Sequence, residues 1–254
     1  MPPAKGNVAI QALFYQEIAP ISNSRHADYT VNSGAGYDFA RQTNFVPLAG
    51  TEFEAAAWHY PIVFVDQGSE GLVPAAILGF GDQDNLFVGT DGAWNCAYVP
   101  AYVRRYPYIL ANVTEQETFT VCVDEAYVGC QQDGDGERLF LIGGGNSPYL
   151  EGILSFVQQY HGEFTASAEL CKRLTELDLF EPMQAQVALN SGEKMALGGF
   201  NIIGRERLHA LSAEVLQEFN QKGILELLHL HLFSLANFGP LMDRHSVRLN
   251  GSQP

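Results

Sequence analysis

Two histidines separated by one residue, His229 and His231, have the spacing of a metal site. On a β-strand both imidazoles would share one face and could bind one metal ion. On an α-helix they would lie about 200° apart. Residues 225–238 contain no Val, Ile or Thr, which favours a helix over a strand. We therefore predict a helix here and no metal ion on this pair.

His26 and Asp28 have the spacing of two ligands in a 2-His-1-carboxylate iron site. Such a site needs a third ligand, and His161 and His209 both lie where we expect helices. A role of Asp28 in a turn or helix cap is therefore favoured. Iron held by His26 and Asp28 is kept as the alternative interpretation, and no catalytic residue is assigned.

Cys122 and Asp124 alternate along a predicted strand and would share one of its faces. A nucleophilic cysteine needs a histidine or a cation that stabilises the thiolate, and neither is adjacent in the sequence. We expect a buried thiol beside solvated acids. None of the four cysteines forms a CxxC pair, which favours free thiols over disulfides.

Two glycine-containing loops could bind ions but lack the residues that binding requires. In the loop that begins at Asp133, Arg138 stands where a calcium-binding loop needs glycine. Gly143–Gly145 precede a predicted helix without a GK[ST] or GxGxxG motif. We predict a turn at the first loop, a joint between two parts of the chain at the second, and no bound cofactor.

The densest group of aromatic and cationic residues is the segment from Asn95 to Tyr108, with four tyrosines and two adjacent arginines. Pro100 and Pro107 interrupt a regular strand, which predicts an edge or an irregular loop. Tyrosine and arginine are enriched in binding hot spots, but buried tyrosines also fill protein interiors. Both interpretations stay open. The candidate binding residues are Tyr98, Tyr102, Arg104, Arg105, Tyr106 and Tyr108.

Short apolar runs separated by Gly, Asp and Asn predict a β-rich part up to about residue 145. The predicted strands include 62–65, 75–78, 119–123 and 139–142. From residue 146 to 254 the pattern is mainly helical. Ser147 is a predicted N-cap, and two strands form a hairpin around Ser191 and Gly192. The predicted helices cover 148–160, 165–177, 205–221 and 224–238, before a frayed tail at 246–254. The expected class is α+β, with parts 1–145 and 146–254 packed as one compact domain.

Several of these segments resemble, in order and spacing, elements of the SapC family across residues 13–240. The Tyr98–Tyr108 run is the most specific of them. The resemblance implies an association with S-layer secretion loci. The family is also similar to proteins found beside flavin-dependent halogenase-like enzymes and TonB-dependent receptors. It supplies no catalytic residues. The other similar segments are Ser24–Asp28, Phe39–Leu48, Trp58–Phe64, Cys122–Glu125, Gly198–Ile203 and Lys222–Leu235.

Lys and Arg number 14 against 29 Asp and Glu, which gives a net charge of −15. This charge disfavours nucleic acid as a partner. The first residues lack a secretory signal pattern, and Glu226, His229 and Asn237 interrupt the apolar stretch after residue 224. We expect a non-catalytic cytoplasmic accessory protein without membrane insertion, which binds a protein or peptide. The family name implies a link to surface-layer or outer-membrane protein export. The alternatives are an iron oxygenase acting on a peptide or protein, a partner of a halogenase-like enzyme, and a scaffold subunit.

Overall fold

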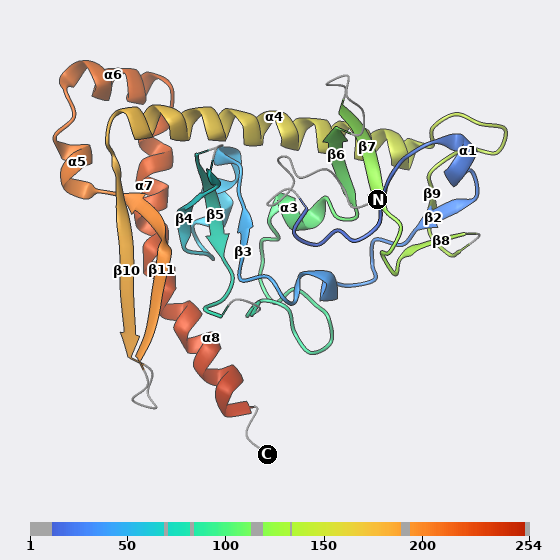
Figure 1. The fold of residues 1–254 in the computed structure, drawn as a ribbon, viewed down its shortest axis with the longest axis horizontal. Helices are drawn as coiled ribbons and strands as arrows, with labels where there is room; N and C mark the ends of the chain where they lie inside the picture. Colours follow the sequence, from blue (N-terminus) through green and yellow to red (C-terminus); the bar gives the residue numbers. More distant parts are fainter. Residues whose placement is uncertain are drawn as a thin grey trace. The chain divides into compact units, whose positions relative to one another are not determined.

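The structure is a computed structural model, and it describes residues 12–68, 71–81, 84–112, 119–132, 134–188 and 194–251. Three antiparallel β-sheets draw most of their strands from the N-terminal half of the chain, and a long helix followed by shorter helices makes up most of the remainder (Figure 1). The predicted α+β class is therefore confirmed.

The chain forms two compact units, and each is assembled from two separated segments. The first contains Met1–Ala40 and Tyr102–Gly162, and the second contains Arg41–Ala101 and Glu163–Pro254. The predicted division at residue 145, and the packing of both parts as one compact domain, stay predictions.

The first unit holds two small antiparallel sheets, with strand orders β1-β7-β6 and β8-β2-β9. The β7 strand pairs with β1 on one side and with β6 on the other, and its residues from Val121 to Asp124 are buried. The elements of this unit are β1 (Ile18–Pro20), α1 (Asn23–His26), β2 (Tyr29–Val31), η1 (Asp38–Ala40), β6 (Tyr108–Asn112), β7 (Phe119–Asp124), β8 (Cys130–Gln132) and β9 (Glu137–Arg138). The short helix α3 (Ala101–Arg104) leads into it from the second unit.

The second unit is built on a five-stranded antiparallel sheet of order β10-β11-β4-β5-β3. The predicted C-terminal hairpin is confirmed, and β11 also pairs with β4 through Phe200 and Val65. The hairpin therefore extends a sheet that begins in the N-terminal half. Its predicted turn at Ser191 and Gly192 lies outside the described residues. The strands are β3 (Phe45–Pro47), β4 (Ile62–Asp66), β5 (Leu72–Ile77), β10 (Phe180–Ala188) and β11 (Lys194–Ile203).

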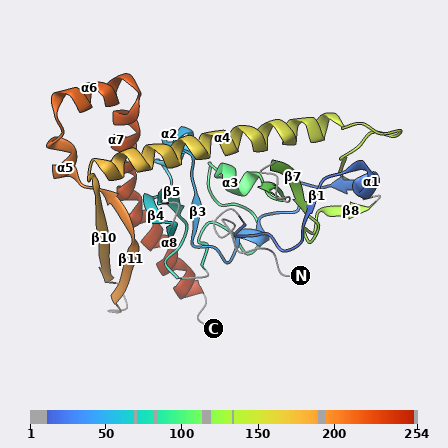
Figure 2. The ribbon, with the colours of Figure 1, turned by 45° about the horizontal axis from the view of Figure 1, so that its top comes forward.

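Helices cover this sheet, and in both views α7 runs behind the β10–β11 hairpin (Figures 1 and 2). The helical elements of the unit are η2 (Gly50–Glu52), α2 (Phe53–Ala56), α5 (Arg205–His209), α6 (Ala213–Gln221), α7 (Ile224–Ser234), η4 (Leu235–Asn237) and α8 (Phe238–Gly251). Sheet and helices enclose a core of Phe64, Cys171, Leu174, Leu179, Ile203, Leu208, Phe219, Ile224, Leu228 and Leu232.

The helix α4 (Pro148–Glu176) is a single element of 29 residues, which corrects the prediction of two helices separated at Gly162. Figure 2 shows it as one uninterrupted helix. A glycine inside a helix costs about 1 kcal/mol relative to alanine. A continuous buried stripe crosses this position and offsets that cost. The stripe consists of Leu150, Val157, Tyr160, Ser167, Cys171 and Leu174. The predicted N-cap is confirmed, because the Leu150 amide donates to the Ser147 hydroxyl at 3.1 Å.

Three further boundaries differ from the prediction. Residues 139–142 form a loop with one isolated bridge, because Gly143–Gly145 all adopt positive φ and turn the chain there. The predicted helix over 205–221 is divided at Ser212, which caps α6 by accepting from the Val215 amide. The predicted tail at 246–251 is helical, because Arg248 is hydrogen bonded to Asp84 and to the Asn85 carbonyl. The helix stop at Gly223 is confirmed, with φ of 70°.

Within the described residues, one helical stretch, Ile224–Leu249, is long and apolar enough to cross a membrane. Its mean hydropathy is 1.2, and a third of its most apolar window is buried inside the protein. Ile224, Leu228 and Leu232 belong to the core of the second unit. A core helix meets the same criterion of length and composition. The absence of membrane insertion stays a prediction.

Candidate functional site

The segment from Tyr98 to Tyr108 is folded into the protein over most of its length. It contains the short helix α3, which the sequence did not predict, and Tyr108 begins β6, which lies at the edge of its sheet as the prolines indicated. Tyr102, Arg105, Tyr106 and Tyr108 are buried, Tyr98 is half-buried and Arg104 is exposed.

Tyr98 belongs to the second unit, where it meets a buried carboxylate. Its hydroxyl donates to Glu52 Oε1 at 2.8 Å, and the Ala101 amide donates to the same oxygen at 2.7 Å. Glu52 Oε2 accepts from the Ala49 amide at 2.8 Å. Glu52 is 5% exposed. Its carboxylate therefore fixes the beginning of the tyrosine-rich segment to η2.

Arg105, in the first unit, lies among aromatic rings. Its guanidinium carbon is 4.3 Å from the ring centroid of Tyr102, 5.0 Å from that of Tyr160 and 5.8 Å from that of Tyr15. Arg105 is 4% exposed. Ring faces carry negative charge density and stabilise a cation that has lost water. We call this arrangement the tyrosine box.

The tyrosine hydroxyls of the first unit also have partners inside it. Tyr15 donates to the Tyr108 carbonyl at 2.6 Å, and Tyr102 accepts from the Leu13 amide at 2.9 Å. Tyr108 donates to the Tyr149 hydroxyl at 3.2 Å. Burial raises the pKa of Tyr15, Tyr102 and Tyr108, so these hydroxyls stay protonated. Four of the six candidate binding residues thus fill the interior. Whether Tyr98 and Arg104 contact a partner stays a prediction.

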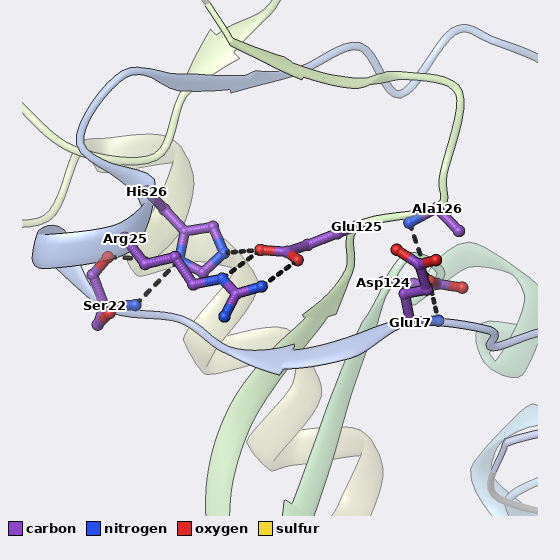
Figure 3. A network of polar contacts seen from close by, with 7 residues as sticks. All are labelled: Glu17, Ser22, Arg25, His26, Asp124, Glu125 and Ala126. Carbon is purple, nitrogen blue, oxygen red and sulfur yellow. Dashed lines mark hydrogen bonds and ion pairs between the residues drawn. The ribbon is translucent and has the colours of Figure 1, made fainter. Parts of the chain in front are cut away.

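Asp124 ends β7 and is completely buried. Its carboxylate accepts from the Gln16 amide at 2.9 Å, the Glu17 amide at 2.8 Å and the Ala126 amide at 3.1 Å. The Tyr106 hydroxyl donates to it at 3.1 Å. Figure 3 shows the carboxylate next to Glu17 and Ala126. The expectation of solvated acids is therefore wrong for Asp124. The segment that leads into β1 supplies two of these four donors, the amides of Gln16 and Glu17.

Glu125 joins two of the family-like segments, Ser24–Asp28 and Cys122–Glu125. Arg25 on α1 donates to it through Nε at 2.6 Å and Nη2 at 2.5 Å. His26 Nε2 lies 3.0 Å from Glu125 Oε1 (Figure 3). Hydrogen bonding from Arg25 is the main cause that lowers the pKa of Glu125. The carboxylate therefore stays ionised and ties α1 to the end of β7.

Ser22, His26 and Glu125 together have the composition of a hydrolase triad. A triad requires the serine hydroxyl to hydrogen bond to the imidazole. Here His26 Nδ1 lies 3.3 Å from the backbone N and O of Ser22, and the Ser22 hydroxyl contacts that of Ser24. His26 is also completely buried. This geometry builds a helix turn and offers no nucleophile.

His26 and Asp28, the alternative iron ligands, have separate partners. His26 is buried against Glu125, whereas Asp28 is exposed and lies 3.4 Å from Arg138 Nη2. Across the described ranges, no group of three or more His, Cys, Asp or Glu side chains could hold a metal ion. As folded, these two residues therefore do not form a shared site.

Cys122 and His231, from two further sequence motifs, are part of the interior. Burial raises the pKa of the Cys122 thiol to about 11, the opposite of what a nucleophile needs. His229 and His231 lie on the predicted helix, with the first exposed and the second buried. His231 Nε2 accepts from the Ile203 amide at 3.1 Å, and its Nδ1 lies 2.9 Å from the Ile62 carbonyl oxygen. The imidazole therefore fastens α7 to β11 and β4.

An exposed pair of aromatic side chains was not found from the sequence. Trp58 follows α2 and Phe233 lies on α7, and their ring centroids are 5.2 Å apart in an edge-to-face arrangement. The two side chains are 66% and 50% exposed. We call them the aromatic pair. Phe233 and the buried Leu232 are adjacent in an apolar sequence, so only the helical geometry shows which one faces outward.

The structure thus defines an α+β protein in which Arg105, Asp124 and several tyrosines are buried in the first unit, with an aromatic pair exposed on the second. The sequence profile of the SapC family matches residues 21–241, and the chain belongs to that family. No curated protein and no solved structure matches the chain.

Proposed function

We propose that this chain is a non-catalytic binding protein whose partner is a protein or peptide. Its place is the cytoplasm, and its role is accessory to surface-layer or outer-membrane protein export, as the family name suggests. The aromatic pair of Trp58 and Phe233 is the single observation that carries the binding role.

Trp58 and Phe233 are more exposed than the other Phe, Tyr and Trp side chains of the second unit. Trp58 is more than half exposed, while Trp94 is buried and donates from Nε1 to the Tyr60 hydroxyl at 2.9 Å. Tryptophan is the residue type most enriched in binding hot spots, because it buries a large area on contact. Two exposed aromatic rings in mutual contact therefore support a recognition surface.

The polar clusters of the first unit support a binding role over catalysis. A general acid, base or nucleophile must reach a substrate. His26 and Asp124 are completely buried, and each is within hydrogen-bonding distance of another part of the chain. The oxygenase alternative would require His26 to leave Glu125 and meet Asp28. A structural role of these residues is the simpler account.

Affinity purification of the full chain from its host, after chemical crosslinking, tests the proposal. We expect a discrete protein or peptide to be enriched over a tag-only control. Enrichment of no other chain, together with turnover of a substrate that is lost in His26→Ala, would overturn the proposal in favour of an enzyme.

A further inference from the structure

We infer that the aromatic pair docks a basic segment of the partner, in which lysine or arginine side chains flank an apolar anchor. This inference rests on the proposed function and adds the chemistry of the partner. It follows from the support, the shape and the charge of the surface around Trp58 and Phe233.

Packing and hydrogen bonds fix the elements that carry the aromatic pair. The helix α2 packs against α7. Asn237 Nδ2 donates to the Ala57 carbonyl at 2.7 Å and to the Tyr60 carbonyl at 3.1 Å, which fixes the loop that carries Trp58. Ser234 Oγ accepts from the Ile62 amide at 2.9 Å beneath the same helix. The exposed rings are therefore positioned before a partner arrives, which lowers the entropy cost of binding.

The outer face of α7 forms a stripe beside the pair. Glu226, His229 and Phe233 follow one another at helical spacings of three and four residues, and all three are exposed. On α2, Glu54 and Ala55 are exposed next to the loop of Trp58. The exposed carboxylates of Glu54 and Glu226 thus belong to α2, which precedes Trp58, and to α7, which carries Phe233.

The charges of α2 and α7 favour a basic partner. Glu54 is the only charged residue of α2, and Glu226 is the only Asp, Glu, Lys or Arg of α7. A ring face attracts a cation, and carboxylates near it strengthen that attraction. The chain carries a net charge of −15, so a second copy or an anionic membrane would be repelled. In a basic segment with an apolar anchor, the anchor would pack on the rings and the basic side chains would pair with the carboxylates.

Trp58 itself reports the binding. In a Trp94→Phe variant it is the only tryptophan, and its emission shifts to shorter wavelength when the indole is covered. The probe is a short tryptophan-free peptide in which lysines flank two leucines. Its counterpart replaces the lysines with glutamates. If Trp94→Phe does not fold, the contribution of Trp58 can be obtained by subtracting the emission of the Trp58→Phe variant from that of the wild type.

We expect a saturable blue shift with the lysine peptide alone. Phe233→Ala should weaken binding about tenfold, as is usual for a hot-spot aromatic residue. Glu54→Gln combined with Glu226→Gln should weaken it several-fold and reduce its dependence on salt. Val247→Ala, at an exposed residue of α8, is the matched control and should leave the affinity unchanged.

Four results would overturn the inference: equal affinity for the glutamate peptide, the absence of a saturable shift, a shift with anionic vesicles alone, or a shift that follows protein concentration alone. Failure of this inference differs from failure of the proposed function. If the crosslinked partner is captured equally by the wild type and Trp58→Ala, binding occurs elsewhere on the chain. If neither captures a partner, the proposed function fails as well.

Discussion

The interior of the first unit around Asp124 and the core of the second unit around His231 accommodate a buried ionisable group in different ways. Asp124 is a completely buried carboxylate that three amides and a tyrosine hydroxyl satisfy. His231 is an equally buried imidazole, and burial lowers its pKa to about 4, so it is neutral at pH 7. Donors from separate segments surround the Asp124 carboxyl group, whereas burial in the apolar core favours the uncharged form of the His231 imidazole.

The two regions therefore derive their specificity from different interactions. Around Asp124, chain segments are joined by directional bonds that fail together when one acceptor is lost. Around His231, packing of apolar side chains sets the arrangement, and the imidazole supplies one acceptor and one donor. Substitutions that remove either a hydrogen-bond acceptor or a packed side chain test which interaction stabilises each region.

Asp124→Ala should have the largest effect. It leaves the Gln16 and Glu17 amides and the Tyr106 hydroxyl without their buried acceptor. We expect a loss of about 3–5 kcal/mol in the free energy of unfolding, measured by urea denaturation. Asp124→Asn keeps the shape and one acceptor, so it should lose less. A loss below about 1 kcal/mol for Asp124→Ala would show that packing, and not hydrogen bonding, holds this region.

The pH dependence of stability should report His231. Its pKa is about 4 in the folded chain and about 6.5 when unfolded, so between these values the unfolded chain binds more protons. The contribution is complete above pH 6.5 and is lost as the pH falls towards 4, by about 3 kcal/mol. We expect His231→Gln to remove this part of the slope in urea titrations at several pH values. His229→Gln, at an exposed position of the same helix, is the control. An unchanged slope in His231→Gln would contradict the neutral buried imidazole.

The adjacent arginines should differ in their effects. Arg105→Ala removes a buried side chain from the tyrosine box and should cost about 2–3 kcal/mol in thermal or urea unfolding. Arg104 is exposed, with its guanidinium 5.4 Å from the Phe156 ring, and Arg104→Ala should cost less than about 1 kcal/mol. Equal losses of stability in the two variants would mean that burial in the tyrosine box does not make Arg105 more important for stability than the exposed Arg104.

Local signals in the sequence predicted a large part of the fold. Ser147 before Pro148 marked the start of α4, and Gly223 marked the end of α6. The hairpin of β10 and β11 was predicted from the Ser191–Gly192 turn pattern between two short strands. These features depend on residues within a few positions of one another, so they can be recognised without tertiary contacts.

Features that depend on distant segments could not be predicted. The pairing of β11 with β4 joins residues far apart in the sequence, and so does the cover of Asp124 by Gln16 and Glu17. Cys122 and Asp124 are both buried, and a buried carboxyl group needs donors, which here come from residues outside β7. Four of the six candidate binding residues are buried, and only Arg104 and Tyr98 are not. The aromatic pair could be recognised only in the three-dimensional structure.

The ion pair of Arg25 and Glu125 should give the smallest effect. Arg25 is 58% exposed, so water screens its charge, and Arg25→Ala should lose less than about 1 kcal/mol in urea unfolding despite the two short bonds to Glu125. Glu125→Ala should lose more, because it also removes the partner of the buried His26. Since the pKa of Glu125 is lowered in the folded chain, its contribution is present at neutral pH and is lost in acid. A loss for Arg25→Ala as large as that for Asp124→Ala would mean that the surface pair and the buried carboxylate form one cooperative network. Hydrogen bonding would then stabilise the surface of the first unit as well as its interior.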